Sequence, residues 1–321
     1  MRKHNLLSLL EGKLQPEELE LVYRSYDIVG DIVIICVPEK LRHHSIIIGE
    51  TIMQLHKNVR VVWRQSSAVF GEFRLRKLEH VAGEKRTVTT HIEHGCIFSV
   101  DLENCYFSPR LSYERMRIAR LVQPREVVVN MFAGVGPFSI VIAKHSDAER
   151  IYSIDVNPTA VRFMQENILL NRVLNRVVPL KGDAKTVIKE RLQKTADRVL
   201  MPLPEKAYEY LDIAVDALQP RGGWIHYYDF EHARKGENPI DKVKAKVSET
   251  LSLLNVNFAI PFSRLVRDTG PRWQQVALDI QVRGKKTDFQ QIFYASKLYY
   301  TLTEGGTRNK ENPAGHTRLP N

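Results

Sequence analysis

The stretch "VVVNMFAGVGPF" (Val127–Phe138) is an apolar, strand-like run that ends in two closely spaced glycines, Gly134 and Gly136. In an open α/β sheet, ligands bind outside the carboxyl ends of the strands, where a glycine turn lets backbone N–H groups approach the ligand. A second such run, "IYSIDVNP", ends in Asp155, and the separation is about the 20 residues expected of the acid that holds ribose hydroxyls. The two stretches together predict a domain that binds a nucleoside.

Strand-like and helix-like patterns alternate around these stretches. Apolar runs predict strands at Val127–Phe132, Ile151–Asp155, Val177–Leu180, Arg198–Met201 and Trp224–Tyr228. Such alternation requires a parallel sheet with helices on both faces. A last pair of runs, Asn257–Pro261 and Gln274–Val282, is separated by the turn-rich "RDTGPR" and predicts an antiparallel hairpin at the sheet edge. The expected fold class is α/β, Rossmann-like, with a mixed sheet.

The chain is expected to divide into four segments. Residues 1–66 are predicted to form a small α+β domain, and residues 67–121 are predicted to form a β-rich connecting segment that binds RNA. Residues 122–283 form the Rossmann-like domain, and residues 284–321 a packing helix followed by a disordered tail. The helix is predicted from "TDFQQIFYASKLYYTLTE" and the tail from a Gly/Asn/Pro-rich end.

Composition indicates the cellular location of the protein and the class of partner that it binds. The formal net charge is +10, which favours a polyanionic partner, although basic housekeeping proteins are common. No apolar run approaches the roughly 20 residues that span a bilayer, and the start lacks a signal peptide, so a cytoplasmic location is expected. Three cysteines without a CxxC pair predict buried thiols and neither a disulfide framework nor a four-ligand zinc site, and no metal is expected.

The glycine turn favours a ligand without phosphate. A dinucleotide fingerprint needs a third glycine, and Phe138 or Ser139 stands near that place, which disfavours a nicotinamide dehydrogenase. S-adenosylmethionine fits, because it has a ribose and an adenine but a sulfonium in place of a diphosphate. Asn157 and Pro158 after the acid also form a helix N-cap and first turn. Asp183 in "KGDA" either flanks the adenine or caps the next helix.

Several stretches, in order, resemble the archaeal and eukaryotic tRNA (guanine-N1)-methyltransferases that act at position 37, which have the class I S-adenosylmethionine-dependent fold. They are "GEFRLRKLEHVAGE", "YFSPRLSYERMRIA", "NMFAGVGPFSI", "SIDVNPTAV", "ADRVLMPLP" and "GGWIHYYDF". The related wybutosine aminocarboxypropyl transferases share the cofactor turn, but Arg110 and Pro137-Phe138 favour methyl transfer. The resemblance implies a monomer that acts on the anticodon arm of tRNA.

The resemblance also assigns residues. It implies that Glu114 accepts the N1 proton of guanine and that an arginine of "FRLR", preferably Arg74, stabilises charge on O6. Without it, an i,i+3 ion pair between Glu114 and Arg117 would be preferred. Pro202 and Pro204 complete the predicted catalytic set. The predicted cofactor set is Phe132, Ala133, Gly134, Val135, Gly136, Pro137, Phe138, Asp155, Val156, Asp183, Ala184 and Met201. The predicted RNA contacts are Arg76, Arg110, Arg115 and Arg117.

One position departs from the family pattern. Many members have asparagine where "MPLPE" has Pro202, and proline has neither a side-chain amide nor an N–H. Base recognition there would depend on backbone carbonyls or on another residue such as Glu205, which leaves the modified atom open. The alternatives are aminocarboxypropyl or C7-methyl transfer to a wyosine precursor at the same position, or a non-catalytic RNA-binding protein with a degenerate cofactor fold.

Overall fold

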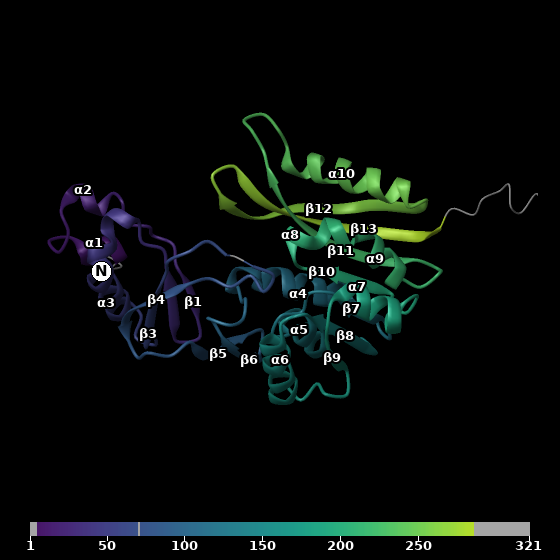
Figure 1. Ribbon diagram of the computed structural model, residues 1–321, viewed down its shortest axis with the longest axis horizontal. Coiled ribbons are helices and arrows are strands. Elements are labelled where there is room, and N and C mark those ends of the chain that lie inside the picture. The colour runs from purple at the N-terminus through teal and green to yellow at the C-terminus, as the bar shows by residue number, and fades with distance from the viewer. Residues whose placement is uncertain (1–4, 70, 286–321) are drawn as a thin grey trace, which may run out of the picture. The chain divides into compact units, whose positions relative to one another are not determined.

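The computed structural model describes residues 5–69 and 71–285 (Figure 1). The predicted packing helix in "TDFQQIFYASKLYYTLTE" and the predicted tail lie outside the described residues. Among the described residues, no helix has the length and apolar character needed to cross a membrane.

The N-terminal region is a four-stranded sheet with helices. Its strands lie in the order β1-β2-β3-β4, and β2 is apolar and buried at every position. The elements are α1 (Leu6–Leu10), α2 (Pro16–Leu19), β1 (Asp27–Val29), β2 (Ile32–Ile35), η1 (Glu39–His44), α3 (Ser45–Leu55), β3 (Val61–Gln65) and β4 (Leu78–Gly83). Because β4 pairs with β3, this sheet continues across the boundary expected at residue 66.

A hairpin and a helix lead from this sheet to the larger one. Strands β5 (Val88–Glu93) and β6 (Cys96–Asp101) turn at His94-Gly95, where both residues have positive φ (49° and 69°). Positive φ at both central residues is the geometry of a type I′ hairpin turn. The short helix η2 (Pro109–Leu111) and the helix α4 (Ser112–Leu121) follow.

The second sheet has seven strands in the order β12-β13-β11-β10-β7-β8-β9. Strands β7 to β11 are parallel to one another, and β13 is antiparallel to β11. The elements are β7 (Val127–Asn130), α5 (Pro137–His145), β8 (Arg150–Asp155), α6 (Pro158–Leu170), β9 (Val177–Lys181), α7 (Ala184–Val187), η3 (Ile188–Leu192), β10 (Arg198–Met201), α8 (Pro204–Ala207), η4 (Tyr208–Tyr210), α9 (Leu211–Ala217), β11 (Gly223–His232), α10 (Pro239–Leu253), β12 (Val256–Gly270) and β13 (Trp273–Lys285). The mixed, Rossmann-like sheet predicted from the sequence is confirmed.

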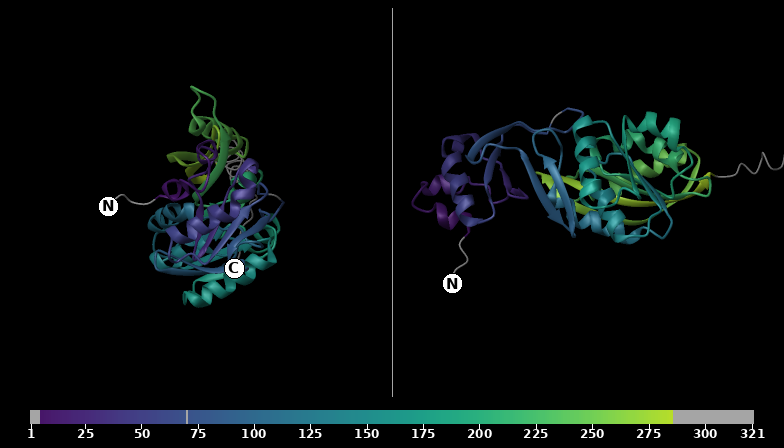
Figure 2. Two further views of the ribbon diagram at one scale, coloured as in Figure 1. Left: turned by 90° about the vertical axis from the view of Figure 1, so that its left-hand side faces the viewer. Right: turned by 90° about the horizontal axis from the view of Figure 1, so that it is seen from below.

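Helices cover both faces of this sheet. Side chains of α4, α5 and α6 pack on one face, and side chains of α7, α9 and α10 pack on the other (Figure 1). At the edge, β12 and β13 are joined by Pro271 and Arg272 alone, so they form the predicted antiparallel hairpin, whose long strands are visible in Figure 2. The strand order reverses between β7 and β10, which is the topological switch point where such sheets bind ligands.

Candidate active site

A cavity lies at this switch point, outside the carboxyl ends of the parallel strands. Eight residues of the predicted site line it: Arg74, Phe132, Gly134, Asp155, Val156, Asp183, Ala184 and Pro202. The structure therefore brings the arginine of "FRLR" and the acid at the end of β8 into one pocket.

The glycine turn has the conformation that glycine permits. Gly134 and Gly136 have φ of 57° and 90°, and a Cβ at Gly136 would lie only 3.0 Å from Met164 Cγ. Asp155 braces this turn, because its carboxylate accepts the N–H groups of Gly134 (2.6 Å) and Asn157 (2.9 Å). Burial raises the pKa of Asp155, and the two N–H groups oppose that rise.

Asp183 caps the next helix, as one of the two predictions has it, and it also lines the pocket. It caps α7 by accepting the N–H groups of Lys185 (2.9 Å) and Thr186 (3.3 Å). Its second oxygen accepts the hydroxyl of Tyr210 at 2.5 Å. The Tyr210 ring meets Phe132 edge to face at 5.2 Å, so the two rings form one aromatic wall.

At the opposite side of the pocket, Arg74 meets an aromatic ring and a carboxylate. Its guanidinium lies 4.0 Å from the centre of the Tyr106 ring and 2.9 Å from Glu205 Oε1. Its Nε is buried and has no hydrogen-bond partner. Burial would raise the pKa of Tyr106, but the charges of the nearby arginines, Arg74 first, lower it. A donor without a partner at a pocket wall is available to an acceptor on a ligand.

Glu114 is buried behind this pocket and does not line it. Its carboxylate accepts Tyr228 Oη and Arg117 Nε at 3.0 Å each, and lies 3.1 Å from Arg264. The i,i+3 pair with Arg117 that the sequence offered as an alternative therefore exists, but it is buried and not on the surface.

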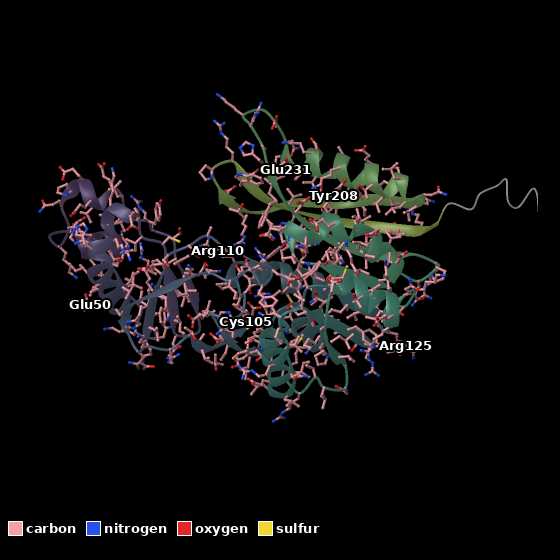
Figure 3. The ribbon with its side chains drawn as sticks, in the orientation of Figure 1. Glu50, Cys105, Arg110, Arg125, Tyr208 and Glu231 are labelled. Atoms are coloured by element: carbon pink, nitrogen blue, oxygen red, sulfur yellow. The ribbon has the colours of Figure 1, made fainter. Side chains whose placement is uncertain are left out.

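The four predicted RNA contacts lie in different surroundings. Arg110, labelled in Figure 3, is 44% exposed and paired with Asp27, whereas Arg76 and Arg117 are largely covered. Arg115 is 2% exposed and donates to Glu93 at 2.7 Å and 2.8 Å. A guanidinium enclosed in this way cannot reach RNA phosphates, so the prediction for Arg115 is wrong.

The remaining predicted residues support the pocket without lining it. The turn and the start of α5 are formed by Ala133, Val135, Gly136, Pro137 and Phe138. Met201 ends β10 and Pro204 begins α8, and both are buried. The sequence missed several lining residues, among them Glu72, Phe73, Tyr106, Met131, Lys206 and Tyr210. Tyr106 stands in the quoted "YFSPR", whereas the local sequence of Tyr210 carries no signal for a site.

One further group could hold a metal ion. Glu18, His43 and His44 lie close together in the N-terminal region, away from the pocket.

Comparisons with known proteins cover most of the chain. The model of the TRM5/TYW2 methyltransferase domain matches residues 89–254, and that of the TYW2 N-terminal domain matches residues 6–87. The tRNA (guanine(37)-N(1))-methyltransferase Trm5b of Pyrococcus abyssi is 41% identical over 83% of this chain and 78% of its own length. The tRNA 4-demethylwyosine(37)-methyltransferase Taw21 of Saccharolobus solfataricus is 36% identical over 81% of this chain and 94% of its own.

Solved structures agree with these matches. A complex of aTrm5 with tRNALeu has a TM-score of 0.76 at 36% identity, covering 88% of this chain and 79% of that one. Methanocaldococcus jannaschii TYW2 in complex with AdoMet has a TM-score of 0.59 at 27% identity, covering 81% of this chain and all (100%) of that one.

Proposed function

This chain belongs to the TRM5/TYW2 methyltransferase family, and from that membership we propose that it transfers a methyl group from S-adenosylmethionine to N1 of guanine at position 37 of tRNA. The observation that carries the proposal is that Asp155 and Arg74 line the same pocket. We further propose that the chain acts as a monomer on the anticodon arm, in the cytoplasm. The tRNA complex of aTrm5 supports tRNA as the partner.

The chemistry of the pocket suits this cofactor. Two carboxylates, Asp155 and Asp183, line the cavity and would repel a diphosphate. Ribose hydroxyls can donate to Asp155, and the Phe132–Tyr210 wall can contact an adenine. When bound, S-adenosylmethionine supplies an electrophilic methyl group on its sulfonium.

The base must lose a proton before it can accept the methyl group. N1 of guanine carries a hydrogen, and negative charge develops on O6 when that hydrogen leaves. We propose that Arg74 donates to O6 and that Glu114 accepts the proton. Because Glu114 does not line the pocket, the base has to come within reach of Glu114 Oε1, which is buried without a hydrogen-bond partner and lies 3.1 Å from Arg264.

The test is methylation of an unmodified tRNA transcript that has guanine at position 37. Nucleoside mass spectrometry should find 1-methylguanosine at that position. In single-turnover assays Glu114→Gln should be at least about 10²-fold slower, the scale of general base catalysis, while the exposed Glu149→Gln should keep the wild-type rate. No methyl gain by wild-type protein would refute the function, and a full rate for Glu114→Gln would refute the role of that residue.

A second candidate function is transfer to a wyosine precursor at the same position. Similarity to Taw21 and to the TYW2 N-terminal domain supports it, as does Pro202 at the pocket wall. A transcript carrying 4-demethylwyosine separates the outcomes, because methyl and aminocarboxypropyl groups add different masses. Calorimetry that finds no S-adenosylmethionine binding would instead support a non-catalytic RNA-binding protein.

A further inference from the structure

We propose that Glu205 selects guanine by accepting hydrogen bonds from its exocyclic 2-amino group, in partnership with Arg74. The inference rests on the proposed function, since it concerns the base that enters the same pocket. It assigns a specificity role to a residue in the first turn of α8.

Arg74 and Glu205 form an ion pair at the wall of the cavity. Arg74 lines the cavity and is 13% exposed at its side chain, while Glu205, in the first turn of α8, is 45% exposed. The two meet at 2.9 Å beside Tyr106, whose ring is a surface on which a base can stack. Glu205 itself does not line the cavity, so the pair places a donor at the cavity wall and an acceptor directly beside that donor.

Arg74 has one nitrogen that lacks a hydrogen-bond partner. Arg74 uses one terminal nitrogen on Glu205, and its buried Nε has no hydrogen-bond partner. A buried donor left unpaired is destabilising, so this nitrogen is suited to an acceptor supplied by a ligand. Guanine O6 is such an acceptor, and its charge rises as N1 loses its proton.

The hydrogen-bonding groups of guanine indicate which of them the Glu205 carboxylate accepts from. The edge of guanine that carries O6 also carries the N1 hydrogen and the 2-amino group. N1 has to stay free to receive the methyl group, so the group left for an acceptor on the protein is the 2-amino group. Glu205 is the acidic neighbour of Arg74, and Pro202 has no side-chain group that could serve instead.

The same pair rejects adenine. Adenine has a 6-amino donor where guanine has O6, and it has no 2-amino group. Arg74 would face a second donor, and Glu205 would lose its partner. Sites built on hydrogen bonds discriminate strongly when a wrong ligand leaves their polar groups unpaired.

The experiment combines protein variants with a base analogue. Transcripts with guanine or inosine at position 37 differ at the target base by the 2-amino group alone. Wild-type kcat/KM in single-turnover assays should fall about 10- to 100-fold from guanine to inosine, as for a hydrogen bond to a charged group. Glu205→Ala should show a similar loss with guanine and little further loss with inosine.

Glu209→Ala is the matched control, because Glu209 is an exposed glutamate in the same segment that pairs only with Lys206 among the described residues. It should keep the full guanine-to-inosine ratio. If Glu205→Ala also keeps that ratio, or if wild-type protein does not distinguish the two bases, the role of Glu205 is refuted. Failure of the proposed function looks different, because wild-type protein would then methylate neither transcript.

Discussion

At the residue scale, Asp155 has two tasks. Its carboxylate closes the glycine turn through two backbone N–H groups, and it faces the cavity where the ribose is proposed to bind. Each carboxylate oxygen has lone pairs left for a hydroxyl donor. The same atoms thus shape the pocket and are the ones proposed to bind the ribose.

We predict that Asp155→Ala lowers the affinity for S-adenosylmethionine by about 10- to 100-fold, because hydrogen bonds to a charged group are lost. Isothermal titration calorimetry measures this directly, with circular dichroism to check that the variant is folded. Asp147→Ala, an exposed position in the loop before β8, should bind as wild type does. Unchanged affinity in Asp155→Ala would contradict the assignment.

Asp279 is a second residue whose charge matters, in this case for stability. It accepts from Arg117 at 2.6 Å and 3.1 Å and contacts His226 at 2.6 Å. Burial would raise the pKa of Asp279, but His226 and Arg117 outweigh it and lower the pKa to about 2. Because the folded-state pKa lies below that of the unfolded chain, the stabilisation is complete above about pH 4 and is lost as the pH falls towards 2.

Asp279→Asn should therefore lower the free energy of unfolding by about 2 kcal/mol at pH 7. Urea denaturation at pH 7 and at pH 3 should show the difference from wild type shrinking at the lower pH. Asp268→Asn, at an exposed position of β12, should have little effect at either pH. A difference that is equal at both pH values would be inconsistent with this account.

At the element scale, Asn167 of α6 and Asn171, the C-cap residue of that helix, take the place of a neighbouring strand beside β6. Asn167 accepts the N–H of Ser99 at 2.7 Å and donates to its carbonyl at 3.0 Å. Asn171, one helical turn later, does the same with Ile97 at 2.8 Å and 2.6 Å. The backbone groups of Ile97 and Ser99 on the edge of β6 that does not pair with β5 thus form their hydrogen bonds with these two side chains.

Replacing Asn167 by alanine should cost about 2–4 kcal/mol, because backbone groups of Ser99 and Val135 would be left buried without partners. Chemical denaturation gives the value. Gln165→Ala, on the exposed face of the same helix, should change stability by no more than about 0.5 kcal/mol. A loss as small for Asn167→Ala as for this control would mean that water replaces the amide.

At the scale of the whole molecule, charged contacts join the N-terminal sheet to the segments after it. Arg86 and Thr89 bind Asp31, and Arg110 binds Asp27 at 2.6 Å. These pairs connect the β1–β2 hairpin to the chain that leads into α4. The net charge of +10 belongs to the entire chain and suits a polyanion.

We predict that tRNA affinity falls at least about tenfold between 50 and 200 mM salt, because phosphate contacts release counterions. Fluorescence anisotropy with labelled tRNA measures the slope. Binding of S-adenosylmethionine provides the internal control. Its sulfonium, ammonium and carboxylate groups leave a single net charge, against the many phosphates of tRNA, so its affinity should change little with salt. A tRNA affinity independent of salt would argue against an electrostatic interface.

The sequence alone determined the order of the elements and the place of the ligand. Periodicity is a local property, so the alternation of strands and helices, the glycine turn and Asp155 at a strand end could be read from neighbouring residues. The family resemblance added Arg74 as a pocket residue, and the structure places it there.

The tertiary structure alone decided which distant residues meet. The pairing of β4 with β3, the burial of Arg115 against Glu93, and the contact of Arg74 with Glu205 join parts of the chain that no local pattern connects. A charged side chain is exposed or buried according to the partner that packing brings to it, and that partner lies far away in the sequence.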